Sequence, residues 1–144
     1  MRIAVFAIAL GLSLSCAAMA ANITQSQAVK AYEAGKAGQA PRNGYDYASC
    51  AGAWAGWTKH ALENYKDPLV AALPDDMKSS GALKKQLYWQ EKAMAEVKAG
   101  RIEGTQAQAM LTTGKALVDT SLAEATASAM TRMFGELGRC HAQQ

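Results

Sequence analysis

Two cysteines that lie about 90 residues apart, Cys50 and Cys140, constrain the fold of this chain more than any other feature. The only other cysteine, Cys16, falls inside an N-terminal segment with the pattern of an export signal. In the oxidising compartments that exported proteins reach, an even pair of cysteines is typical of a disulfide. We therefore expect Cys50 and Cys140 to be bridged, and the chain-entropy model gives a loop of this length about 4 to 5 kcal/mol of stabilisation.

The export interpretation rests on residues 1–20. A basic second residue precedes an apolar run over residues 3–14, and residues 18–20 form a small-x-small cleavage site. This pattern is typical of a secretory signal peptide and is too short for a membrane-spanning helix. We expect residues 1–20 to be a signal peptide and residues 21–144 to be a single α-helical domain that is periplasmic or secreted. A lipid-modified Cys16 is the alternative, although the leucine of a lipoprotein signal is not at the expected position.

The charge pattern excludes some classes of partner. The formal net charge is +3, and both signs are interspersed along the chain without a basic stripe. A nucleic-acid-binding protein would show such a stripe, so we expect no nucleic-acid partner. No second apolar segment approaches the length of a membrane span, and we expect no transmembrane segment after signal cleavage.

Helical patterns dominate the chain beyond the signal. Alanine is abundant, valine and isoleucine are scarce, and no alternating strand pattern reaches five residues. We expect an all-α fold, an irregular bundle of about four main helices with short connecting turns. The expected helices run from Thr24 to near Gly35 or Gly38, from about Tyr45 or Asp46 to Tyr65, from Ser79 or Ser80 to Gly100, and from Thr105 to about Leu137. The last is expected to bend near Gly114 or Thr120.

Capping signals support the starts of these helices. Thr24 with Gln27, and Thr105 with Gln108, have the spacing of capping boxes. Asp67 before a proline has the form of an N-cap that opens a short helical turn, and a serine at position 79 or 80 would cap the third helix.

Helical periodicity places both cysteines on core-facing stripes. In the second helix one face carries Tyr47, Cys50, Trp54, Trp57 and Ala61, and the opposite face carries a ridge of small residues, Ala48, Gly52 and Gly56. In the last helix the stripe consists of Leu111, Val118, Leu122, Ala125, Ala129 and Met133, and Cys140 follows on the same side. The two stripes predict that a disulfide joins the last helix to the second.

The third helix holds the candidate partner-binding residues. Its apolar stripe is formed by Leu83, Leu87, Met94 and Val97, so Trp89 points about 120° away from it. An aromatic residue on a charged face either packs under another segment or contacts a partner, and the first alternative is favoured. If the second holds, the contact residues are Trp89, Lys85, Lys92 and Tyr88.

The chemistry-bearing residues identify no enzyme. Cys50, His60, Cys140 and His141 make a poor zinc set because Cys140 and His141 are adjacent, and no covalent haem motif is present. No nucleophile elbow, phosphate loop, calcium loop or His-Glu-x-x-His motif occurs. We expect no cofactor, no metal site and no catalytic residue.

The resulting expectation is an exported small helical protein that binds another protein in the cell envelope or outside the cell, as inhibitors, immunity proteins and chaperone-like accessory factors do. One alternative is a bundle that holds haem, a metal ion or an apolar small molecule. Another is an uncharacterised enzyme, for which a pocket converging on His60, Asp75 or His141 would be the sign.

Overall fold

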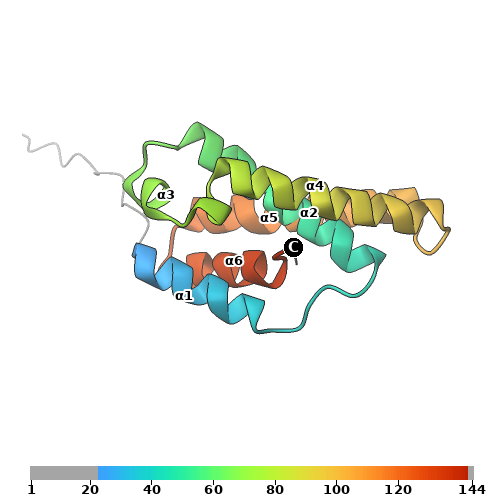
Figure 1. The fold of residues 1–144 in the computed structure, drawn as a ribbon, viewed down its shortest axis with the longest axis horizontal. Helices are drawn as coiled ribbons and strands as arrows, with labels where there is room; N and C mark the ends of the chain where they lie inside the picture. Colours follow the sequence, from blue (N-terminus) through green and yellow to red (C-terminus); the bar gives the residue numbers. More distant parts are fainter. Residues whose placement is uncertain (1–22, 143–144) are drawn as a thin grey trace, which may run out of the picture.

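The computed structural model describes residues 23–142, and this part of the chain has the expected all-α fold (Figure 1). The expected signal peptide lies outside the described residues. The elements are α1 (Gln25–Lys36), α2 (Gly44–Glu63), α3 (Pro68–Ala72), the 3₁₀ turn η1 (Asp75–Met77), α4 (Ser79–Lys98), α5 (Gly104–Glu124) and α6 (Ala127–Arg139). No strand occurs within residues 23–142. No helix in this range is both long and apolar enough to cross a membrane.

Helix α2 is the centre of the bundle. Helices α4 and α5 pack along it from two sides, with few contacts between each other, whereas α1 packs mainly against α6 (Figure 1). The predicted core face of α2 is confirmed, since Cys50, Trp54 and Trp57 are fully buried. Because α2 is enclosed by several helices, its second face is buried as well.

Helix α5 packs on the small-residue ridge of α2. A Cβ atom added to Gly52 would overlap the backbone carbonyl of Leu111, and one added to Gly114 would overlap that of Ser49. Glycine at both positions therefore lets the backbones of α2 and α5 come into direct contact. The same device joins the other pair of helices, because a Cβ at Gly138 of α6 would overlap the carbonyl of Tyr32 in α1.

The long C-terminal helix expected from the sequence is two helices. The break lies at Ala125, which has a left-handed φ of 51°, and the side chain of Thr126 caps α6 by accepting a hydrogen bond from the amide of Ala129. The expected bend near Gly114 or Thr120 is wrong, since both residues lie inside α5. The break lets α6 fold back alongside α1.

The capping predictions have mixed outcomes. The capping box of Thr24 and Gln27 and the N-cap role of Asp67 are confirmed. The second box is instead formed by Glu103 and Gln106, because α5 begins earlier than the Thr105 spacing indicated. The predicted serine cap of α4 is also wrong: Lys78 is the N-cap residue and makes no side-chain capping bond.

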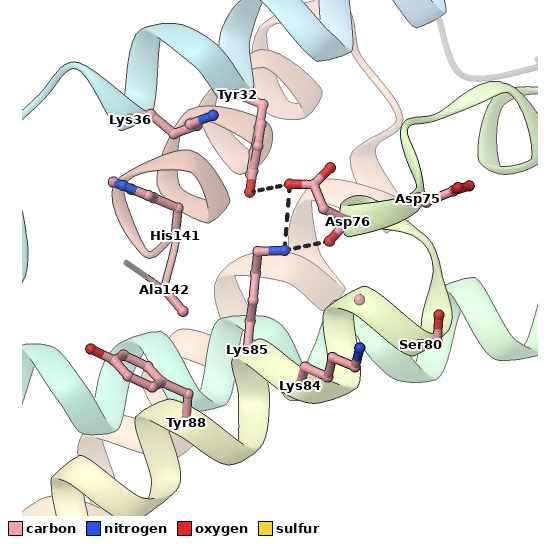
Figure 2. A pocket seen from close by; sticks show the side chains of 11 residues that line it. Tyr32, Lys36, Asp75, Asp76, Ser80, Lys84, Lys85, Tyr88, His141 and Ala142 are labelled. Atoms are coloured by element: carbon pink, nitrogen blue, oxygen red, sulfur yellow. Dashed lines mark hydrogen bonds and ion pairs between the residues drawn. The ribbon is translucent and has the colours of Figure 1, made fainter. Parts of the chain in front are cut away.

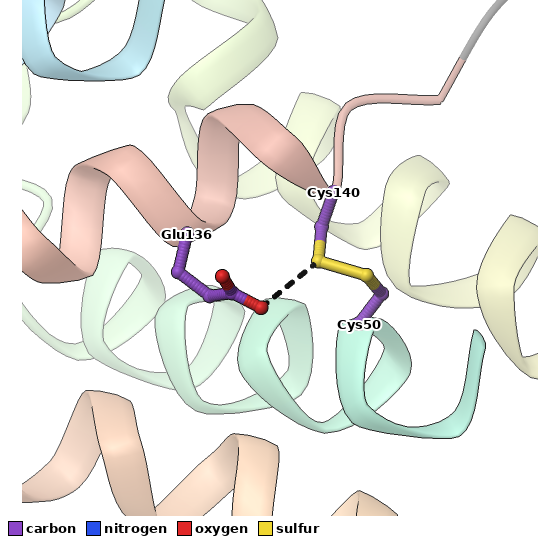
Figure 3. A group of neighbouring side chains, drawn as sticks. All are labelled: Cys50, Glu136 and Cys140. Carbon is purple, nitrogen blue, oxygen red and sulfur yellow. Dashed lines mark hydrogen bonds between the residues drawn. A yellow bond between two sulfur atoms is a disulfide. The ribbon is translucent and has the colours of Figure 1, made fainter. Parts of the chain in front are cut away.

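The predicted disulfide is present between Cys50 of α2 and Cys140 at the end of α6, with Cα atoms 5.3 Å apart (Figure 3). Both cysteines are fully buried. The backbone carbonyl of Cys140 also accepts hydrogen bonds from the indole N–H groups of Trp54 and Trp89, each at 2.6 Å. The end of α6 is thus held to α2 by a covalent bond and to α2 and α4 by hydrogen bonds.

Candidate functional site

The buried face of α4 differs from the apolar stripe predicted for it. Its buried residues are Ala82, Lys85, Trp89 and Ala93. The leucines and the methionine of the predicted stripe lie outside, with Leu83 43 %, Leu87 54 % and Met94 58 % exposed. The expectation that this stripe faces the core is therefore wrong. We call the exposed set of Leu83, Leu87 and Met94 the α4 ridge.

Trp89 is covered, which was the favoured alternative. Its side chain is 4 % exposed, stacks on Tyr47 with ring centroids 5.5 Å apart, and is met edge-on by Tyr88. Its position off the apolar stripe reflects the true packing face of α4. Of the four residues singled out from the sequence, Trp89 and Lys85 are buried, and Tyr88 and Lys92 are half-buried beside them.

Lys85 also lines an open cleft between α1, η1, α4 and the residues that follow α6 (Figure 2). Its volume is about 990 Å³. The polar side chains that line it come from all of these elements: Tyr32, Lys36, Asp75, Asp76, Ser80, Lys84, Lys85, Tyr88 and His141. The cleft therefore collects charged and aromatic groups from segments that are distant in the sequence. Two of the three residues expected for an enzyme pocket, Asp75 and His141, line it, whereas His60 does not.

A hydrogen-bonded network occupies the centre of the cleft (Figure 2). The ammonium group of Lys85 donates to the backbone carbonyl of Asp76 at 2.5 Å and lies 3.4 Å from the Asp76 carboxylate. The hydroxyl of Tyr32 donates to the same carboxylate oxygen at 3.1 Å. The Lys85 ammonium also lies 5.1 Å from the ring centroid of Trp54, a cation–π distance. Asp76 thereby fixes one cation and one hydroxyl at the floor of the cleft.

Burial and charge change the proton affinities of this network. Desolvation, and next the negative charge of Asp76, raise the pKa of Tyr32 well above its ordinary value. Desolvation lowers the pKa of Lys85, and the positive charges of Lys36 and Lys84 lower it further, whereas Asp76 opposes both effects. Tyr32 consequently remains a neutral hydrogen-bond donor at physiological pH. The network holds the Lys85 ammonium in a fixed position beside the Asp76 carboxylate.

The remaining cations of the cleft have weaker partners. The Lys36 ammonium forms an i,i+3 pair with Glu33 at 3.1 Å, on an exposed surface of α1. Within residues 23–142 no acidic group lies within ion-pair distance of Lys84. His141 lies with its Nδ1 3.0 Å from the carbonyl of Gly138. Because a carbonyl only accepts, Nδ1 carries the proton and donates it, which directs the other ring nitrogen away from that carbonyl.

A second, more apolar groove of about 460 Å³ lies between α4 and α5. Its floor is made by Ala48 and Ala51 of α2, and Met94 of the α4 ridge and Leu111 of α5 are on its walls. The groove exists because α4 and α5 both pack on α2 and have few contacts with each other. The α4 ridge thus reaches, through Met94 at its end, a groove with a floor of small side chains.

The one cluster of metal-ligating residue types in the described range is Cys50, Glu136 and Cys140 (Figure 3). Its two sulfur atoms are bonded to each other, so they offer no thiolate to a metal ion. Glu136 instead pairs with Arg139, whose guanidinium lies 2.6 Å from the carboxylate. The hydrogen bonds to Glu136 raise the pKa of Arg139. This cluster is part of the disulfide's surroundings.

Comparison with protein-family models, with curated proteins and with solved structures finds no match for this chain. The function is therefore argued from the residues and surfaces described above.

Proposed function

We propose that this chain is an exported, non-enzymatic binding protein that acts by contacting another protein through the α4 ridge. The observation that carries the proposal is the exposure of three large apolar side chains, Leu83, Leu87 and Met94, on one side of a well-packed helix. Contiguous exposed apolar side chains on a soluble domain are typical of an interaction surface.

The arrangement of the ridge supports a protein as the partner. At 100° per residue the three side chains project within about 40° of one another, from Leu83 to Met94 in the middle part of α4. The neighbouring groove has alanines in its floor, which leave room for the side chains of a partner segment. Anchors at such spacings beside a groove are typical of helix-in-groove recognition.

The charges beside the ridge indicate the chemistry of the partner surface. Lys84 and Lys98 lie along α4, and within residues 23–142 no acidic group lies within ion-pair distance of either. Two acidic residues lie between them, Glu91 and Glu96, and Glu96 pairs with Arg101. A partner helix with apolar side chains on one face and carboxylates at its margin would complement this surface, since charge complementarity sets register and partner choice.

The export of the chain is part of the proposal and is supported by the disulfide. A bridge between residues separated by 90 positions closes most of the described chain into one loop. Such disulfides persist in the periplasm or outside the cell and are rare in reducing compartments.

A photo-crosslinking residue tests the proposed surface. Placed at position 87 of the full chain and illuminated with an extract of the envelope and secreted fractions, it should give a discrete adduct with one protein. The matched control is position 62 on α2, because Leu62 is 57 % exposed and lies outside the ridge. Equal labelling from both positions, or none from position 87, would contradict the proposal.

A further inference from the structure

Three lysines, Lys36, Lys84 and Lys85, line the cleft between α1, η1 and α4, and its inward-facing carboxylate, Asp76, contacts Lys85. Lys36 and Lys84 lie near enough to Lys85 for their charges to lower its pKa, while Asp76 is the carboxylate that contacts Lys85 directly. The other acidic residue of the lining, Asp75, has a side chain that is 95 % exposed and pairs with Lys78 at 2.9 Å. The interior of the cleft therefore carries more positive than negative charge.

The groups around this charge come from opposite walls of the cleft. Lys85 rises from α4 with its ammonium in the centre, Lys36 extends from α1 on the opposite wall, Tyr88 lies on the α4 wall, and His141 lies at the side of the cleft between α1 and α4 (Figure 2). The hydroxyl of Tyr88 has no hydrogen-bond partner within residues 23–142, and the Nδ1 proton of His141 is used by Gly138. The volume of about 990 Å³ leaves space for a ligand among these side chains.

We propose that this cleft binds an oxyanion, a carboxylate or a phosphate group, held by Lys84, Lys85 and Lys36. The anion would relieve the mutual repulsion of the three cations, and it would accept charge-assisted hydrogen bonds in a partly buried place where they are strongest. Asp76 and Tyr32 position Lys85 through the contacts already described. Leu83, Leu87 and Met94 of the α4 ridge do not line the cleft, so the apolar surface and the cleft can be tested separately, although Lys84 lies beside both.

Titration calorimetry of the full chain at low ionic strength tests the site, with inorganic phosphate in one arm and citrate in the other. Binding in the phosphate arm alone identifies a phosphate ligand, binding in the citrate arm alone identifies a carboxylate, and binding in both identifies a general oxyanion site. Each of these results supports the proposal if the lysine dependence below holds. Absence of binding in both arms would overturn it.

The variant Lys84→Gln should weaken binding about tenfold, the effect of losing one charge-assisted hydrogen bond. Lys84 is exposed and makes no ion pair within the described residues, so this variant keeps the fold. Lys30→Gln is the matched control, since Lys30 is an exposed lysine on α1 that does not line the cleft. Leu87→Ser should bind the anion as the parent does. Equal affinities of Lys84→Gln and Lys30→Gln would show that binding is nonspecific and would overturn the proposal.

Discussion

Trp54 and Trp89 donate their indole N–H groups to one and the same acceptor, the backbone carbonyl of Cys140, each at 2.6 Å. The two rings come from α2 and α4, and the carbonyl belongs to the half-cystine that ends α6. A carbonyl oxygen has two lone pairs, so both bonds can form at once. This shared acceptor joins three helices at the buried end of the bundle.

The shared acceptor predicts non-additive effects on stability. Trp54→Phe or Trp89→Phe should each cost about 1 kcal/mol beyond the smaller ring, because the carbonyl keeps one partner. The double variant should cost about 1 to 3 kcal/mol more than the sum of the two, since the buried carbonyl is then left without a partner. Urea denaturation of the four proteins measures the coupling. Additive free energies of unfolding would show that the acceptor is not shared in this sense.

The close contact between α2 and α5 predicts that Gly52 does not tolerate a methyl group, whereas a glycine outside this contact does. Gly52→Ala should destabilise the protein by about 1 to 3 kcal/mol or more, because the new methyl group meets the carbonyl of Leu111. Gly135→Ala is the control in a helix interior: the added Cβ meets nothing nearer than 3.8 Å. It should be neutral or stabilising by up to about 1 kcal/mol, the difference in helix propensity. Thermal unfolding of both variants decides whether α2 and α5 touch along this line.

Thr58 predicts a substitution that does not destabilise. Its side chain is 4 % exposed, and its hydroxyl has no hydrogen-bond partner within the described residues. Thr58→Val keeps the shape and removes the unpartnered polar atom, so it should be neutral or stabilising by about 1 kcal/mol. Thr126→Val is the contrasting case and should cost about 1 kcal/mol, because the Thr126 hydroxyl caps α6. Chemical denaturation compares the two, and equal losses would mean that the Thr58 hydroxyl does have a partner.

The cleft network predicts a pH dependence. Desolvation and Asp76 raise the folded-state pKa of Tyr32 above its ordinary value of 10.0, so the folded protein retains this proton longer than the unfolded chain. The corresponding stability is fully present below pH 10 and is lost as the pH rises above it. Tyr32→Phe loses about 1 kcal/mol at neutral pH with the hydrogen bond to Asp76, but it lacks the alkaline loss. The difference between the two proteins should therefore shrink as the pH rises through 10, and a constant difference would exclude the raised pKa.

The sequence predicted the fold class and the disulfide because both follow from local patterns. The stripe of Cys50, Trp54 and Trp57 is apolar at helical spacing, and two cysteines in a chain expected to be exported have one obvious connection. The break at Ala125 escaped prediction because no glycine or proline marks it; Thr126, a good N-cap, was the available signal. The second buried face of α2 depended on contacts of Gly52 that the sequence does not show.

The surfaces of α4 were harder to predict, for a physical reason. Hydropathy assigned the core face to leucine and methionine, whereas the bundle buries Ala82, Lys85 and Trp89. Lys85 can occupy a packed position because its alkyl stem is apolar and its ammonium is held by Asp76. The cleft gathers residues from both ends of the chain, so its existence depends on the tertiary fold. One signal was available, since the off-stripe Trp89 already indicated a second covered face.

The central claim is that the α4 ridge recognises a protein, and a matched pair of charge variants tests it most directly. The parent chain, Leu87→Asp and Leu62→Asp are immobilised separately, and the amount of the crosslinked partner that each retains is measured. The two leucines are similarly exposed, so each variant places one carboxylate on the surface with little effect on the fold. We predict that Leu62→Asp retains the partner as the parent does and that Leu87→Asp binds it at least about 30-fold more weakly, the effect of losing a hot-spot side chain. Equal retention by the two variants would contradict the assignment of the binding surface to α4.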